Sequence, residues 1–259
     1  MRLHAHEYGD PAGPPVVCLH GVTSHGQRFR RLGEGPLAAR RVVAPDLRGH
    51  GHSDRSPPWS TATHASDVLD TIDALGIDRA AWLGVSFGGR VTAAVTAREP
   101  GRVERIALLD PALQLPADVC AVQAELECQP HVFASAEAAI EERLAAGTLF
   151  STPREFLEEE ASQHLEPVEG GLRYRYSAQA AIAAWGEMAD QAPPIADVPT
   201  LIVHGERSWL ALDAHVERYR ERLGERLELA TLPAGHALLW DAFAETSARL
   251  ARFLETQPR

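Results

Sequence analysis

Short apolar runs alternate with longer amphipathic runs along most of the chain. Apolar runs without regular polar alternation are typical of strands that are covered on both faces. Such runs occupy residues 16–20, 41–45, 80–85, 103–109, 200–204 and 227–232. Residues 62–75 and 88–98 have helical periodicity, and glycine or proline follows each of them as a helix stop. The pattern predicts an α/β fold: a doubly wound, mostly parallel sheet with helices packed on it.

This alternation stops after residue 112. The next block contains the Ala- and Glu-rich runs SAEAAIEERLAAG and TPREFLEEEASQHL, and DQAPP closes it. Such runs predict helices, and no strand of the sheet type is expected within the block. We interpret it as a helical cap inserted between two strands of the C-terminal half. The expected organisation is a single domain over 1–259, with a core of residues 1–112 and 196–259 and a cap of residues 113–195.

Composition narrows the possible partners. The formal net charge is −11 and 45% of the residues are hydrophobic, as in ordinary water-soluble proteins. An acidic surface repels a phosphate backbone, so nucleic acid is not an expected partner. All 25 basic residues counted as Lys and Arg are arginines. The oligomeric state is not encoded in any pattern that we recognise.

The sequence has no apolar run of the roughly 20 residues that a membrane helix needs, and its first residues do not resemble a signal peptide. We therefore expect a cytoplasmic protein without a membrane partner. Cys18, Cys120 and Cys128 lack the spacing of a disulfide framework or a zinc site. His50 and His52 share one turn but lack a third convergent ligand. We expect no cofactor and no metal.

The segment WLGVSFGGR supplies a candidate nucleophile, Ser86. It contains the pattern G-x-S-x-G as Gly84, Ser86 and Gly88, between an apolar strand and a helical run. Small flanking residues allow a sharp turn that exposes the serine at the carboxyl end of its strand. The positive end of the following helix points to the same place. The alternative is that Ser86 only caps that helix.

Serine attacks efficiently only when a base accepts its proton. Among the twelve histidines, His236 in LPAGHALLW follows the last strand and precedes a C-terminal helix, where the carboxyl ends of the strands gather. The backbone N–H groups of Phe87 and Val22 are candidate donors for an oxyanion hole. His20 is expected to brace the turn that carries Val22, although a contact with substrate is also open.

Several ordered motifs together resemble one family. The segments LHGVTSHG, PDLRGHGHSD, GVSFGG, RIALLDPAL and AGHALLWDAF resemble the α/β-hydrolase fold family, in its branch of soluble esterases and carbon–carbon hydrolases with a helical cap. The resemblance covers residues 14–112 and 199–254. It implies that Ser86 is the nucleophile, His236 the base, and Val22 and Phe87 the oxyanion donors. Relatives with aspartate in place of this serine form alkyl esters, so the serine implies an acyl-enzyme.

The sequence offers more than one carboxylate that could orient His236. Most family members place it shortly after the glycine of the strand LIVHG, where this chain has Ser208. Asp110, at the end of VERIALLD, is our preferred acid, because some members place it there instead. Asp213 and Glu206 remain alternatives, as does a weakened dyad. Ser208 is then expected to hydrogen-bond to Asp110 or His236.

The expected function is that of a serine hydrolase, carboxylesterase-like, that cleaves small to medium carboxylic esters through an acyl-enzyme. One alternative is hydrolysis of a carbon–carbon bond beside a ketone in aromatic degradation. Another is a ligand-binding member of the fold with weak catalysis. Trp209 is expected to line the pocket. Arg173 or Arg175 could meet a substrate carboxylate, but their alternation with tyrosines in RYRYS favours a solvated face.

Overall fold

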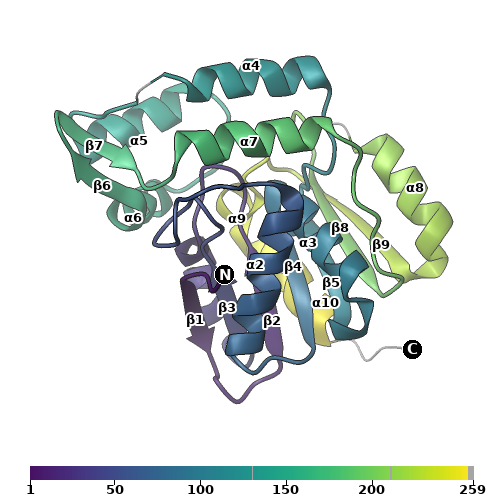
Figure 1. The fold of residues 1–259 in the computed structure, drawn as a ribbon. Helices are drawn as coiled ribbons and strands as arrows, with labels where there is room; N and C mark the ends of the chain where they lie inside the picture. The colour runs from purple at the N-terminus through teal and green to yellow at the C-terminus, as the bar shows by residue number, and fades with distance from the viewer. Residues whose placement is uncertain (130, 211, 256–259) are drawn as a thin grey trace.

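A seven-stranded sheet forms the centre of the molecule (Figure 1). The computed structural model describes residues 1–129, 131–210 and 212–255, and for Asp213 only the backbone. The strand order is β1-β3-β2-β4-β5-β8-β9. The strands are β1 (Ala5–Gly9), β2 (Pro15–Leu19), β3 (Arg41–Pro45), β4 (Ala80–Val85), β5 (Val103–Leu109), β8 (Thr200–Gly205) and β9 (Leu227–Leu232). Among the described strand pairs of this sheet, β1–β3 is antiparallel and the others are parallel. The predicted α/β fold is confirmed.

All six predicted strands are present, with bounds within one residue of those expected. The sequence analysis missed β1, which adds to the edge of the sheet beside β3. Its sequence, AHEYG, contains no apolar run, and none of its residues is fully buried. An edge strand that packs on one side only does not need the continuous apolar residues of a central strand.

Helices cover both faces of the sheet. They are α1 (Arg30–Glu34), α2 (Thr61–Ala74), α3 (Phe87–Arg98), α8 (Asp213–Leu223), α9 (Leu238–Asp241) and α10 (Phe243–Glu255). Alternate residues of β2 enter two separate apolar clusters, because successive side chains of a strand point to opposite faces. Val17 and Leu19 join the cluster that includes α2 and α3, whereas Val16 and Cys18 join the cluster that includes α10. Within the described part of the chain, no helix has the length and apolar character needed to cross a membrane.

The block between β5 and β8 lies over one end of the sheet (Figure 1). It contains α4 (Ala117–Glu127), α5 (Ala136–Ala145), α6 (Arg154–His164), β6 (Leu165–Val168), β7 (Gly171–Tyr174) and α7 (Ala178–Ala189). Strands β6 and β7 form an antiparallel hairpin that the sequence analysis did not predict. LEPV and GLRY are short, and neither is a continuous apolar run, so no strand signal stands out. We propose that residues 113–195 form a cap with this hairpin as part of it.

Arginines of the core join carboxylates of this block along a line that we call the cap–core seam. Arg30 Nη2 and Arg31 Nε bind the Glu159 carboxylate at 2.6 and 2.5 Å, and Arg55 binds Glu166 at 2.9 Å. Guanidinium forks match carboxylates geometrically, and charged partners make the stronger hydrogen bonds.

Glu160 is the buried member of the cap–core seam. It accepts hydrogen bonds from Arg28, from His25 Nε2 at 3.0 Å and from His164 Nδ1 at 3.2 Å. Burial alone would raise the pKa of Glu160, but Arg28 and His25 hold it well below its usual range. The proposed cap thus meets the core through at least one buried carboxylate.

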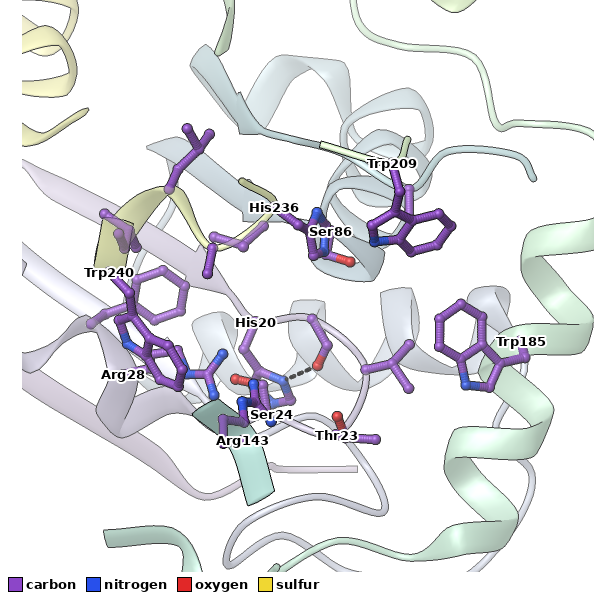
Figure 2. A pocket seen from close by; sticks show the side chains of 18 residues that line it. His20, Thr23, Ser24, Arg28, Ser86, Arg143, Trp185, Trp209, His236 and Trp240 are labelled. Carbon is purple, nitrogen blue, oxygen red and sulfur yellow. Dashed lines mark hydrogen bonds between the residues drawn. The ribbon is translucent and has the colours of Figure 1, made fainter. Parts of the chain in front are cut away.

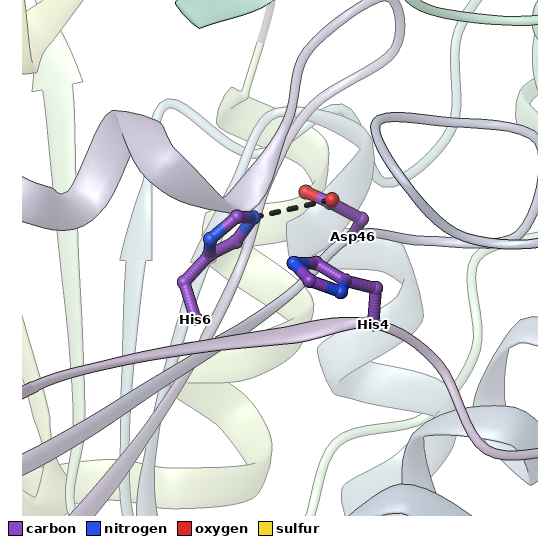
Figure 3. A group of neighbouring side chains, drawn as sticks. All are labelled: His4, His6 and Asp46. Atoms are coloured by element: carbon purple, nitrogen blue, oxygen red, sulfur yellow. Dashed lines mark hydrogen bonds and ion pairs between the residues drawn. The ribbon is translucent and has the colours of Figure 1, made fainter.

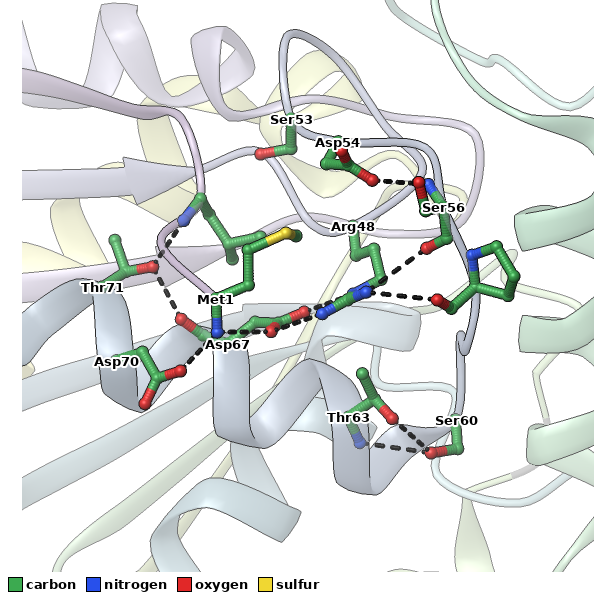
Figure 4. A network of polar contacts seen from close by, with 12 residues as sticks. Met1, Arg48, Ser53, Asp54, Ser56, Ser60, Thr63, Asp67, Asp70 and Thr71 are labelled. Carbon is green, nitrogen blue, oxygen red and sulfur yellow. Dashed lines mark hydrogen bonds and ion pairs between the residues drawn. The ribbon is translucent and has the colours of Figure 1, made fainter.

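The turn PDLRGHGHSD after β3 joins loops of the core. Asp46 Oδ1 accepts from the Gly26 N–H at 2.6 Å, and its Oδ2 accepts from the His52 N–H at 2.9 Å. Arg48 binds both oxygens of Asp67 on α2, at 2.6 and 2.8 Å (Figure 4). These contacts are structural, and they fix the loops that surround the carboxyl end of the sheet.

Candidate active site

Ser86 occupies a strained turn between β4 and α3. Its φ of 52° and ψ of −122° lie in a backbone region that residues other than glycine rarely adopt. Glycine is required on both sides of it. A Cβ at Gly84 would lie 2.6 Å from the Gly88 carbonyl oxygen, and a Cβ at Gly88 would lie 2.1 Å from the Leu19 carbonyl oxygen. The G-x-S-x-G pattern is therefore a steric requirement of this turn.

Two backbone hydrogen bonds fasten Ser86 to the end of the neighbouring strand. The Ser86 N–H donates to the Leu109 carbonyl at 3.1 Å, and the Ala112 N–H donates to the Ser86 carbonyl at 3.0 Å. Both partners flank Asp110 in sequence. The serine and the preferred acid thus share one rigid edge of the sheet.

Asp110 follows β5 directly and is fully buried, with a φ of 43°. Its carboxylate has four donors. Oδ2 accepts from His236 Nδ1 at 2.6 Å and from Ser208 Oγ at 2.5 Å. Oδ1 accepts from His204 Nδ1 at 2.6 Å and from the Gly205 N–H at 3.2 Å. A buried carboxylate with four donors is held in one orientation and in its charged form.

The pKa of Asp110 reflects these partners. Burial alone would raise it, but the hydrogen bond and the charge of His236, with smaller contributions from Ser208 and the Gly205 N–H, hold the pKa below its usual range. An ionised Asp110 accepts a hydrogen bond from the N–H at His236 Nδ1, so the proton stays on Nδ1 and Nε2 is left as the acceptor nitrogen.

The other candidate acids are placed differently. Glu206 is exposed, and its carboxylate has no hydrogen bond or ion pair with a described residue. The Asp213 side chain lies outside the described part of the chain; its backbone begins α8. Ser208 hydrogen-bonds to Asp110 and not to a carboxylate of its own loop.

His204 is a member of this cluster that sequence analysis missed. It is the fifth residue of β8, and β8 pairs in parallel with β5, with Val203 opposite Leu109. The next residue on each strand is then His204 and Asp110. In the sequence His204 resembles a strand residue that precedes a glycine. The signal that could have found it is the predicted adjacency of two strands that both end in polar side chains.

The turn after β2 brings a second backbone segment to Ser86. A Cβ on Gly21 would lie 3.0 Å from the Ser86 Cβ, so glycine lets the turn pass this closely without displacing the serine. His20 braces it: its Nε2 accepts from the Leu47 N–H at 2.9 Å, so Nδ1 carries the proton that it donates to the Gly21 carbonyl at 2.8 Å. Val22 follows this turn, and Phe87 begins α3, where the first N–H groups have no partner within the helix.

Ser86 and His236 both line a cavity of about 190 Å³ (Figure 2). Three tryptophans form much of its wall: Trp185 from α7, Trp209 from the loop after β8, and Trp240 from α9. The Trp209 ring lies 6.0 Å from the His236 ring, centroid to centroid, and Trp209 is 49% exposed. The cavity is a mainly apolar slot with a few polar groups, as small-molecule sites usually are.

Asp241 links the loop of His236 to the proposed cap. Its Oδ2 accepts from the Gly235 N–H at 2.9 Å, directly before His236. Its Oδ1 accepts from the Phe150 N–H at 3.0 Å and from Thr152 Oγ1 at 2.6 Å. One buried carboxylate therefore holds both segments in place.

Two groups of described histidines and carboxylates are close enough to share a cation. His4, His6 and Asp46 form the first (Figure 3), and Asp46 Oδ2 already accepts from His6 Nε2 at 3.2 Å. The second is the seam cluster of His25, Glu160 and His164, where the Arg28 guanidinium already binds both carboxylate oxygens. Neither group lines the cavity beside Ser86.

The fold and the polar edge of the sheet define a hydrolase of the α/β class. The family model described as the alpha/beta hydrolase fold matches residues 14–243, so the chain belongs to this family. It is 33% identical over 243 residues to lipase LipV of Mycobacterium tuberculosis, covering 91% of both chains. It is 30% identical to a 3-hydroxybutyrate-oligomer hydrolase of Cupriavidus necator, covering 91% of this chain and 87% of that one. The crystal structure of E-2-(acetamidomethylene)succinate hydrolase has the same fold, with a TM-score of 0.84 and 24% identity over 98% of this chain and 95% of that one.

Proposed function

We propose that the protein is a serine hydrolase that cleaves small to medium carboxylic esters through an acyl-enzyme, with Ser86 as nucleophile, His236 as base and Asp110 as the orienting acid. The observation that carries this proposal is the 2.6 Å hydrogen bond between His236 Nδ1 and Asp110. His236 lines the same cavity as Ser86. The lipase relative supports an ester as the bond that is cleaved.

The first half-reaction follows from these atoms. Ser86 Oγ attacks the ester carbonyl carbon while His236 Nε2 takes the hydroxyl proton, and ionised Asp110 stabilises the resulting imidazolium. The carbonyl oxygen becomes an oxyanion, and the N–H groups of Val22 and Phe87 are the proposed donors to it. The tetrahedral intermediate collapses, the bond to the alcohol oxygen breaks, and His236 gives its proton to the departing alcohol.

The second half-reaction repeats these roles with water. His236 Nε2 takes a proton from water as the water oxygen attacks the acyl carbon, and the same N–H groups receive the new oxyanion. Collapse breaks the bond to Ser86 Oγ, which regains its proton from His236. The carboxylic acid leaves, and the site returns to its starting state without a cofactor.

The direct test is covalent labelling by a fluorophosphonate, which requires an activated serine but little substrate specificity. We expect one addition by intact mass, carried on the tryptic peptide of residues 80–90, which contains Ser86. Ser86→Ala, checked for folding by circular dichroism, should not be labelled. No labelling of the folded native protein, with the cavity shown to bind a small dye, would overturn the proposal and favour the ligand-binding alternative.

The bond that is cleaved needs its own comparison. Aryl esters should give a rapid burst of alcohol equal to the concentration of enzyme when breakdown of the acyl-enzyme is the slow step. The same enzyme should turn over a vinylogous diketone much more slowly than it turns over the ester. A diketone rate far above the ester rate would replace the ester proposal with carbon–carbon bond hydrolysis.

A further inference from the structure

The cavity beside Ser86 contains a guanidinium that has no carboxylate partner among the described residues. Arg143, on α5, lines the cavity and is only partly exposed. Its guanidinium carbon lies 5.2 Å from the centre of the Trp240 ring. It has no hydrogen bond or ion pair with any residue that the structure describes. A positive charge that is drawn out of bulk water and left unpaired is costly, so such groups in cavities commonly serve a ligand.

The neighbouring charges do not neutralise Arg143. Arg28 lies over the same Trp240 ring, 4.2 Å from its centre, and binds both oxygens of Glu160. Glu160 also accepts from His25 and His164. The pKa of His164 is lowered to about 4 by burial, so that imidazole adds no charge at neutral pH. Two guanidiniums thus face a single carboxylate, and one positive charge remains.

Two further carboxylates lie beyond Arg143 along a neighbouring hollow, which Arg143 also lines. Each of them has another partner. Glu142 pairs with His131 at 2.9 Å, and Glu127 accepts from the Tyr176 hydroxyl at 2.9 Å. Neither forms an ion pair with Arg143. The remaining positive charge is therefore available to a ligand in the cavity that Ser86 also lines.

A second polar group of the cavity is also unused. Ser24 is 3% exposed, and its buried hydroxyl has no hydrogen-bond partner among the described residues. It lines the same cavity as Arg143, and Figure 2 shows both on the side away from Ser86. Buried hydroxyls are rarely left without a partner unless a ligand or water supplies one. A free hydroxyl and a free guanidinium together form a site for an oxyanion.

We propose that Arg143 and Ser24 bind a carboxylate that the substrate carries away from the bond that is cleaved, so that the preferred substrates are monoesters of dicarboxylic acids. This inference rests on the proposed ester hydrolysis at Ser86. One unpaired positive charge matches a carboxylate better than a doubly charged phosphate. The tryptophans that line the cavity suit an apolar chain. Arg143 would then select substrates by charge, whereas Ser86, His236 and Asp110 act on the ester.

The competing explanation is that Arg143 only stacks on Trp240 and holds the cap to the core. Its loss would then lower activity on every ester alike. A carboxylate subsite predicts a change in selectivity instead. The informative quantity is therefore a ratio: kcat/KM for the carboxylate-bearing ester divided by kcat/KM for an uncharged ester of the same shape.

The experiment uses methyl esters of dicarboxylic acids from succinate to suberate, each paired with the ester whose free carboxylate is replaced by a primary amide. Hydrolysis is followed by pH-stat titration with the intact protein. At the best chain length we expect the ratio to be roughly tenfold to a hundredfold, the range of a charged hydrogen bond. Arg143→Gln should bring the ratio close to one, and Ser24→Ala should lower it by several-fold. Arg173→Gln removes one positive charge of the cap outside this cavity, and should keep the native ratio.

Calorimetry on Ser86→Ala separates this inference from the proposed catalysis. The inactive protein should bind monomethyl adipate more tightly than the matched amide, and Ser86→Ala with Arg143→Gln should lose the difference. Equal binding and equal turnover of both esters at every chain length would overturn the carboxylate subsite, even if a fluorophosphonate labels Ser86. Absence of labelling together with preferential binding of the carboxylate would retain the subsite and reject the ester hydrolysis.

Discussion

The proposed catalytic edge of the sheet, where Ser86 and Asp110 lie, and the cap–core seam are held together by different means. At the edge, backbone groups of adjacent parallel strands set the positions: Ser86 is bonded to the end of β5, and Asp110 is bonded to the end of β8. At the seam, charged side chains join segments more than a hundred residues apart, such as Arg30 and Glu159. Reacting atoms tolerate little displacement, so rigid strands are suited to hold them. Side-chain pairs are suited to hold the proposed cap, whose sequence can vary with the substrate without changing the sheet. The following changes test this division.

The largest effect is expected at the edge. Asp110→Asn removes the charge that stabilises protonated His236 and favours the wrong imidazole tautomer, so kcat should fall by about 10⁴-fold. Steady-state kinetics on an aryl ester measures this. Glu206→Gln and Asp213→Asn are the matched controls and should change kcat by less than about threefold. Full turnover by Asp110→Asn, with loss in Asp213→Asn, would move the acid to the loop after β8.

Acid should weaken the core through its buried histidines. Burial lowers the pKa of His50 to about 4 and that of His64 to about 3, against about 6.5 in the unfolded chain. The unfolded chain therefore binds more protons below pH 6.5. The free energy of unfolding is at its full value above that pH and should fall as the pH drops towards 4, by up to about 1.4 kcal/mol per pH unit for each histidine.

Urea unfolding at a series of pH values measures this slope. His64→Leu should make it shallower, whereas His131→Asn, an exposed histidine of the proposed cap, should leave it unchanged. An unchanged slope in His64→Leu would show that other groups carry the acid sensitivity.

At the seam, Glu160→Gln should cost about 3 kcal/mol of stability, because it leaves the partly buried Arg28 without its counter-charge. Glu155→Gln on the same helix removes an exposed partner of Arg31 and should cost less than about 1 kcal/mol. Thermal and urea unfolding provide the comparison. Equal costs for the two variants would contradict the view that burial distinguishes Glu160 from the rest of the seam.

The smallest effect is expected from Ser208→Ala. It removes one of four donors to Asp110, worth about 1 kcal/mol, so kcat/KM should fall by about threefold to tenfold. The measurement is kcat/KM on the same aryl ester. A loss as large as that of Asp110→Asn would mean that Ser208 does more than support the carboxylate.

The sequence predicted the buried parts of the fold well and the half-exposed parts poorly. Central strands such as β4 and β5 must be apolar on both faces, so their runs mark their own bounds. β1 and the β6–β7 hairpin lack such runs, because each leaves much of its surface exposed. Their pairing depends on neighbours that are distant in sequence, which a local pattern does not contain.

The candidate site divides in the same way. The strained turn at Ser86 has a local sequence signature, because it requires glycine at the positions two residues before and after the serine, Gly84 and Gly88. The bond of His204 to Asp110 depends on the register of β5 against β8, and the isolation of Arg143 depends on which partner Glu160 takes. These are properties of the assembled chain. Residue type alone did not indicate that Arg143, and not Arg173 or Arg175, lines the cavity beside Ser86.

The side chains that carry positive charge in the cap–core seam are guanidiniums, because the sequence contains no lysine. A guanidinium keeps its proton at alkaline pH values where an ammonium loses it. The seam should therefore keep its charge pairs in strongly basic media, in which esters themselves become easier to hydrolyse. The absence of lysine also means that no side-chain amine is present for an acyl group to modify. Reactive acyl compounds therefore cannot be lost by acylating lysine side chains of this protein.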